Sequence, residues 1–198
     1  MLSFVSSVCA LAVPVVLLLA LAEHLASPAS LRQALISQAV LPPGLTWPAA
    51  YGVIGVEAAL TLAVGAGLAS ASRGDAPLRL GLAASALLFA TYAAYTFYLL
   101  LRRQGAPCGC SRHDMEVNGW VVLRALGCLA FAGLALRWSD HVLPVSGSGA
   151  RSAIALSAAA TFAIVLWHLP TALQDPVQQV IQQGRSRVRA LGREELTA

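Results

Sequence analysis

Long apolar stretches take up most of this chain. Each approaches the length of about 20 residues that a helix needs to cross a bilayer core of about 30 Å. Because lipid offers the backbone no hydrogen-bond partner, each stretch is expected to form a helix. The expected spans cover residues 4–25, 48–69, 78–101, 118–138 and 152–169. The sequence therefore predicts an all-α, multi-pass membrane bundle over residues 1–170, followed by a polar, basic tail over residues 171–198.

The composition argues against a soluble domain and against binding to nucleic acid. Of the 198 residues, 58% are hydrophobic and 11% are charged, whereas a soluble domain carries about 25% charged residues. All 13 basic residues are arginine, the net charge is only +4, and no aromatic residues are interleaved among them. Nucleic acid is therefore not an expected partner, and membrane lipid is.

The first span is predicted to be a retained helix. It has no basic region before it, and it is longer than the apolar core of about 7–15 residues that signal peptides carry. His24 lies near its end and His168 near the end of the last span, where solvation is the expected environment. Pro170 is expected to end the last span.

The segment after the first span is predicted to form a short amphipathic helix at the membrane surface. Ser27 suits an N-cap, and Pro28 suits the first helical position. Four apolar residues fall roughly on one face of this helix: Leu31, Leu35, Ile36 and Val40. Such a pattern is typical of interfacial helices, and an ordinary solvated helix is the alternative.

Close packing is predicted between the second and third spans, because small residues let membrane helices approach one another. The glycines among them are Gly52, Gly55, Gly65, Gly67 and Gly81. At the start of the second span, Trp47 and Tyr51 are expected at the depth of the lipid headgroups.

Cys108-Gly109-Cys110 is the strongest functional motif. A disulfide between these cysteines would close a very small ring, depart from relaxed geometry and be easily reduced. Arg112 and His113 follow closely, and positive neighbours favour the thiolate form of cysteine. These features favour thiol–disulfide exchange. Two alternatives stay open: a soft metal site, for which the spacing matches no standard zinc pattern, and a static disulfide or inert thiols.

Cys9 and Cys128 lie within the first and fourth spans. A cysteine in such apolar surroundings is usually a small buried hydrophobe. The functional alternative is a secondary thiol pair that relays electrons from Cys108 and Cys110, which would require the two to lie near one another.

Glu57 is the second candidate site, because it lies about 15 Å deep in its span at 1.5 Å per residue. A carboxylate there is expected to face the bundle interior, for proton handling or for a structural hydrogen bond to a neighbouring span. Tyr92, Tyr95 and Tyr98 recur every three residues on the third span, and packing is the expected role of this stripe.

The two sides of the predicted bundle differ in arginine content. With five spans, the cysteine loop shares one side with the surface helix and the tail. That side holds nine arginines, Arg124 included, and the other side holds four. The positive-inside rule then favours a cytoplasmic cysteine loop, whereas disulfide chemistry belongs outside the cytosol. If the fifth span does not cross, the tail changes sides and the count reverses, so the sequence leaves the orientation open.

The order of these features resembles the methylamine utilisation protein MauE family. The resemblance covers residues 2–138 and rests on three stretches: HLASPASLRQALISQAVLPPGL, GVIGVEAALTLAVG and PCGC. It implies a relation to small membrane redox bundles of the DoxX and vitamin K epoxide reductase-like kind, and roles for Glu57, Cys108 and Cys110. The implied client is an exported, disulfide-rich protein, the methylamine dehydrogenase small subunit. Here Ser111 and Arg112 follow the motif, where the family commonly has Phe-Gly.

Together these features predict a multi-pass protein of the cell membrane that acts in thiol–disulfide chemistry. Its expected partner is a soluble thioredoxin-like protein or an exported disulfide-containing client. A membrane quinone is a candidate electron carrier by analogy with related bundles, although no residue requires it. The alternatives are a non-catalytic assembly or export factor and, less in keeping with five spans without an inverted repeat, a small-molecule transporter.

Overall fold

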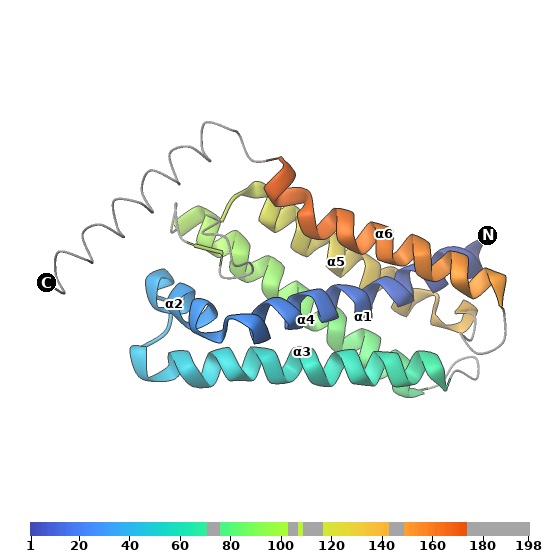
Figure 1. The fold of residues 1–198 in the computed structure, drawn as a ribbon, viewed down its shortest axis with the longest axis horizontal. Helices are drawn as coiled ribbons and strands as arrows, with labels where there is room; N and C mark the ends of the chain where they lie inside the picture. The colour runs from blue at the N-terminus through green and yellow to red at the C-terminus, as the bar shows by residue number, and fades with distance from the viewer. Residues whose placement is uncertain (71–75, 103–106, 109–116, 143–148, 174–198) are drawn as a thin grey trace, which may run out of the picture.

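Helices make up almost all of the chain that the computed structural model describes, which is residues 1–70, 76–102, 107–108, 117–142 and 149–173. The long helices pack side by side, and the short helix α2 lies at one end (Figure 1). The α-helices are α1 Leu2–Ala26, α2 Pro28–Gln38, α3 Thr46–Ala69, α4 Ala76–Arg102, α5 Gly119–Arg137 and α6 Ala150–Ala172, with single 3-10 turns η1 Pro43–Leu45 and η2 Ser139–His141. The predicted all-α membrane bundle is confirmed.

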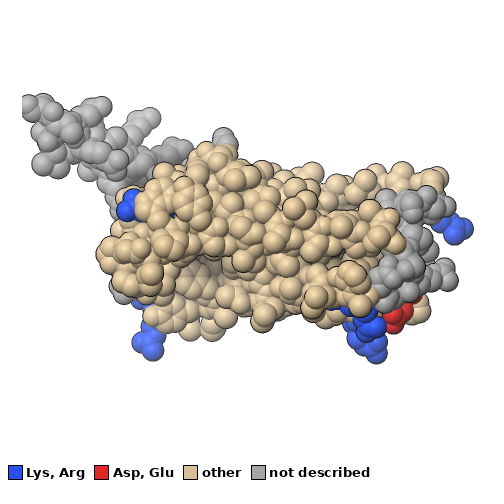
Figure 2. Space-filling view, turned by 90° about the horizontal axis from the view of Figure 1, so that it is seen from below, with Lys and Arg blue, Asp and Glu red and all other residues tan. Residues whose placement is uncertain are grey.

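The long helices alternate in direction along the chain. The N-terminus lies at one end of the bundle, and α2 and the last turn of α6 lie at the other (Figure 1). We call this second end, which also holds Cys108, the cysteine end. Within the part of the chain that the structure describes, five helices are long and apolar enough to cross a membrane. On the face seen in Figure 2, charged side chains lie near the two ends, and the band between them carries none. That distribution suits a bilayer around the middle of the bundle.

The helix α1 forms the centre of the bundle. It contacts α3, α5 and α6, and most of its apolar stretch is buried, whereas the other four long helices expose most of theirs. Large apolar side chains on the outer helices point away from the core, as Leu62, Leu87 and Ile154 do. This pattern is expected in lipid, where an outward apolar side chain is already in a favourable solvent.

Two glycines bring α3 and α4 together. A Cβ atom on Gly67 would lie 3.0 Å from the Cα of Leu78, and one on Gly81 would lie 3.1 Å from Cγ2 of Val64. The predicted close approach is therefore confirmed at these two positions. Gly52, Gly55 and Gly65 have nothing within 4 Å of the same point, so they do not serve this contact.

The short helix α2 covers the cysteine end and packs on α3. Its buried residues are Leu31, Ala34 and Gln38, whereas Ile36 and Val40 are exposed. Of the apolar face predicted from the sequence, Leu31 therefore packs against the protein, whereas Ile36 and Val40 lie on its surface. Arg32 lies over the ring of Trp47 at 5.1 Å, which ties α2 to the start of α3.

The prediction for Pro170 was wrong. Pro170 is buried inside α6, which continues to Ala172, and the N–H of Leu173 still donates to the carbonyl of Leu169. A proline disturbs the turn before it, through its missing N–H and its ring. Residues after it can therefore remain helical for part of a turn.

Candidate functional site

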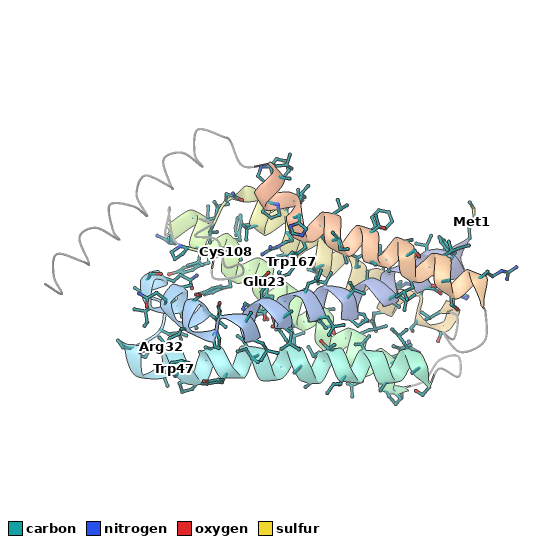
Figure 3. All side chains as sticks on the ribbon, in the orientation of Figure 1. Met1, Glu23, Arg32, Trp47, Cys108 and Trp167 are labelled. Carbon is teal, nitrogen blue, oxygen red and sulfur yellow. The ribbon has the colours of Figure 1, made fainter. Side chains whose placement is uncertain are left out.

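Cys108 lies in the interior of the cysteine end, a short distance in sequence beyond α4. Its side chain is 8% exposed and packs with Leu99, Val117 and Val121. Figure 3 shows Cys108, Trp167 and Glu23 together in the half of the bundle away from Met1. The other predicted residues of this loop, Cys110, Arg112 and His113, lie outside the described residues.

A buried arginine faces this thiol. Nη2 of Arg124, on α5, lies 3.9 Å from Sγ of Cys108, and the Arg124 side chain is 7% exposed. The guanidinium carbon also lies 4.7 Å from the centre of the Trp167 ring, on α6. A buried cation is costly unless its surroundings stabilise it. Here an aromatic face and a sulfur atom lie next to the charge, and such a charge favours the thiolate form of cysteine.

Two hydrogen bonds hold the backbone before Cys108. The hydroxyl of Tyr95, on α4, donates to Oε1 of Gln38, on α2, at 2.6 Å. Nε2 of Gln38 donates to the carbonyl oxygen of Pro107 at 2.8 Å. Gln38 is 2% exposed, and Tyr95 and Pro107 are partly buried. They fix the residue that precedes the thiol against two helices.

Glu57 lies in a second polar cluster, which three helices supply. Its side chain is fully buried, and the hydroxyl of Tyr92, on α4, donates to its Oε1 at 2.8 Å. Nε2 of His24, on α1, lies 3.6 Å from the same oxygen.

The expected solvation of His24 was wrong, because its side chain is only 6% exposed. His24 lies on the inward side of the last turn of α1, whereas Leu25 and Ala26 in the same turn are exposed. His168, in contrast, is exposed, as predicted.

Two of the three tyrosines on α4, Tyr92 and Tyr95, form hydrogen bonds in addition to packing. The rings of Tyr92 and Tyr95 pack against the two apolar cores, as predicted. Their hydroxyls reach Glu57 and Gln38, so both rings also position polar groups of the site. Tyr98, one turn further, is 47% exposed.

Cys9 and Cys128 are free thiols in the main apolar core, which α1 and α5 help to form. Cys108 packs in the separate, smaller core at the cysteine end. This placement fits small buried hydrophobes better than members of an electron relay, which remains a prediction. Among the described residues, no cluster of three or more His, Cys, Asp or Glu side chains could hold a metal ion.

An apolar cavity of about 380 Å³ lies in the other half of the bundle, between α1, α3 and α6. Its lining residues are Leu11, Pro14, Val15, Leu18, Gly65, Leu68, Ala69 and Leu156. None of these side chains can donate a hydrogen bond to a quinone carbonyl, and the cavity lies away from Cys108. The apolar lining of this cavity does not fit the expected quinone.

Sequence reasoning missed Arg124, Gln38, His24 and Trp167 as site residues. Arg124 carried a readable signal, since a charge within a membrane span is a functional candidate for the same reason as Glu57. The roles of Gln38 and Trp167 depend on which helices meet.

Comparison with protein families finds one match over most of the chain. The profile described as "Methylamine utilisation protein MauE" matches residues 2–138. The match includes Cys108, Arg124, Glu57 and Gln38, and it ends before α6. Comparisons with curated proteins and with solved structures give no match.

Proposed function

The chain belongs to the MauE family of methylamine utilisation proteins, and from this premise we propose that it is a membrane thiol–disulfide redox protein. It is a multi-pass membrane protein. In the proposed function, Cys108 and Cys110 exchange a disulfide with a soluble thioredoxin-like protein or an exported client. The cell membrane is the proposed location, with the cysteine end on the extracytoplasmic side.

One observation carries this proposal: the buried Arg124 guanidinium lies 3.9 Å from the Cys108 thiol. Burying an arginine is costly, and a purely structural thiol does not require a cation beside it. A leaving thiolate does, because its negative charge must be stabilised in a dry site. The arrangement therefore supports Cys108 as the cysteine that departs as a thiolate.

The proposed reaction transfers a disulfide to the client. A client thiolate attacks Cys110, because Cys108 is buried, and the Cys108–Cys110 bond breaks as a mixed disulfide forms. A second client thiolate then displaces Cys110. Two electrons and two protons pass from the client's thiols to Cys108 and Cys110. Reversal of the same exchange with an oxidised thioredoxin-like protein restores the pair.

Glu57 is proposed to handle protons during this exchange. Its Oε1 accepts a hydrogen bond from the Tyr92 hydroxyl and lies close to Nε2 of His24, so a proton can be held between these groups. A buried carboxyl in a membrane helix is costly, and such residues commonly mark proton pathways.

Trapping of a mixed disulfide tests the proposal. Purified protein in nanodiscs is reduced and mixed with a thioredoxin-like protein that keeps only one active-site cysteine, activated as a mixed disulfide with thionitrobenzoate. In the Cys108→Ser variant the Cys110 thiolate displaces thionitrobenzoate, and the protein–protein mixed disulfide should accumulate, since neither protein has a second site thiol to resolve it. Cys110→Ser should trap far less, because the remaining thiol is buried. Non-reducing gels with mass spectrometry read the result.

Cys9→Ala is the matched control, since Cys9 is a buried thiol of the main core. It should behave as the unmodified protein. If the protein without Cys108 and Cys110 still supported oxidation of its client in cells, the assembly-factor alternative would replace the redox proposal.

A further inference from the structure

The helix α6 supplies a side chain to the thiol site although it lies outside the residues that match the family. Trp167 places its ring 4.7 Å from the guanidinium carbon of Arg124. The same guanidinium lies 3.9 Å from the Cys108 sulfur. Three separate parts of the chain therefore meet at one buried cation: the loop after α4, then α5, then α6 (Figure 3).

Side chains of α5 and α6 interlock beside the ring. Gly127 lies one turn after Arg124 on the same side of α5. A Cβ atom on Gly127 would lie 3.0 Å from Cδ1 of Leu166, the residue before Trp167. The missing side chain at Gly127 therefore leaves room for the tip of Leu166 next to the ring that packs on the guanidinium.

We propose that Trp167 is a positioning residue that holds the Arg124 guanidinium against the Cys108 thiol, so that α6 completes the thiol site. Its importance for exchange rests on the proposed function. The face of an indole ring attracts a cation, and the attraction is strongest where water is excluded. An arginine side chain has many rotamers, and the ring selects one that points toward the sulfur.

The ring should therefore raise the thiolate fraction of Cys108 indirectly, through Arg124. Without the ring, the guanidinium can move away from the sulfur, and the thiolate loses its counter-charge. Other titratable groups in the described residues around this site are Glu23, His24, Glu57, Tyr92, Tyr95 and Cys128. The comparison below leaves them identical in all proteins tested.

The experiment measures alkylation of Cys108 against pH in full-length protein in nanodiscs. All proteins carry Cys9→Ala, Cys128→Ala and Cys110→Ser, so that Cys108 is the one thiol present. Trp167→Leu should slow alkylation at neutral pH about threefold to tenfold and move the rise in rate to higher pH. Trp167→Phe, which keeps an aromatic face, should restore most of the rate.

Phe162→Leu is the matched control. Phe162 lies on α6 and contacts Phe131 of α5, with ring centres 6.4 Å apart. It removes an aromatic contact between the same helices without touching Arg124. Its alkylation profile should equal that of the parent. If Trp167→Leu fails to fold, Trp167→Met gives the same comparison.

An unchanged profile in Trp167→Leu, or an equal shift in Phe162→Leu, would overturn the inference. The assay contains no client, so its outcome is independent of the trapping experiment. A failed trapping experiment with a shifted alkylation profile removes the proposed function and keeps the Trp167 role. Successful trapping with an unshifted alkylation profile keeps the proposed function and removes the Trp167 role.

Discussion

Gln38 joins parts of the site that lie far apart in the sequence. Its buried amide accepts a hydrogen bond from the Tyr95 hydroxyl and donates one to the Pro107 carbonyl. An amide is one of the few side chains that can do both at once. The position of the thiol therefore depends on a residue in a helix that does not itself cross the membrane.

Replacement of Gln38 by Met should loosen the cysteine end. It removes both hydrogen bonds at similar volume and leaves the Tyr95 hydroxyl and the Pro107 carbonyl, both in partly buried residues, without these partners. We expect the free energy of unfolding to fall by about 2 kcal/mol and alkylation of Cys108 to become faster. Gln33→Met is the control, since Gln33 is exposed on the same helix. Equal stability of both variants, measured by thermal unfolding in detergent, would contradict this role.

The carboxylate of Glu57 can be tested apart from its hydrogen bond. Glu57→Gln keeps an acceptor for the Tyr92 hydroxyl but removes the acid group, so the protein should fold normally and exchange disulfides more slowly. Glu57→Leu also removes the acceptor, which should cost about 1–3 kcal/mol of stability. Stopped-flow exchange with glutathione disulfide and thermal unfolding give the two readouts. Exchange at the unmodified rate in Glu57→Gln would limit Glu57 to a structural role.

Helix packing shows why some features could be predicted from the sequence and others could not. The α3 and α4 bounds follow the apolar runs, because span length is set by the bilayer. Glu57 was found because a lone carboxylate in such a run is conspicuous. The sequence could not show which glycines form helix contacts, since Gly65 and Gly67 differ only in the helix face that they occupy. The contact of Trp167 with Arg124 could not be predicted from the sequence for the same reason, because it depends on which helix faces meet.

A methyl group at Gly67 should separate α3 from α4. Its Cβ would meet the backbone of Leu78 at 3.0 Å, which cannot move aside as a side-chain tip can. We expect Gly67→Ala to lower stability by about 1–3 kcal/mol. Gly65→Ala, with open space at the same point, should be neutral or slightly stabilising. The two unfolding midpoints in detergent decide this, and equal midpoints would count against the contact.

For the whole molecule, five spans place the two ends of the bundle on opposite sides of the membrane. Cys108 and the end of α6 share one side. Arg124 is buried inside the bundle and does not belong in a count of loop charges. Without it, eight arginines remain on the cysteine side and four on the other. That distribution still favours a cytoplasmic cysteine end, whereas the proposed client is exported.

Reporter fusions decide between these orientations. The proposed function predicts that a fusion after the last residue is active in an alkaline phosphatase assay, and that a fusion after Ser70 is active as green fluorescent protein. Phosphatase activity reports export, and fluorescence reports the cytoplasm. The reverse pattern would place the thiols in the cytosol and remove an exported client from consideration.

The position of Trp167 near the last turn of α6 has a consequence for biogenesis. Translation proceeds from the first helix to the last, so the ribosome delivers Cys108 and Arg124 before the indole that packs on the guanidinium. If Trp167 positions Arg124 as proposed, a nascent chain would carry a less reactive thiol until the final helix inserts. The last severalfold of sulfur reactivity would then arrive only when the bundle is complete.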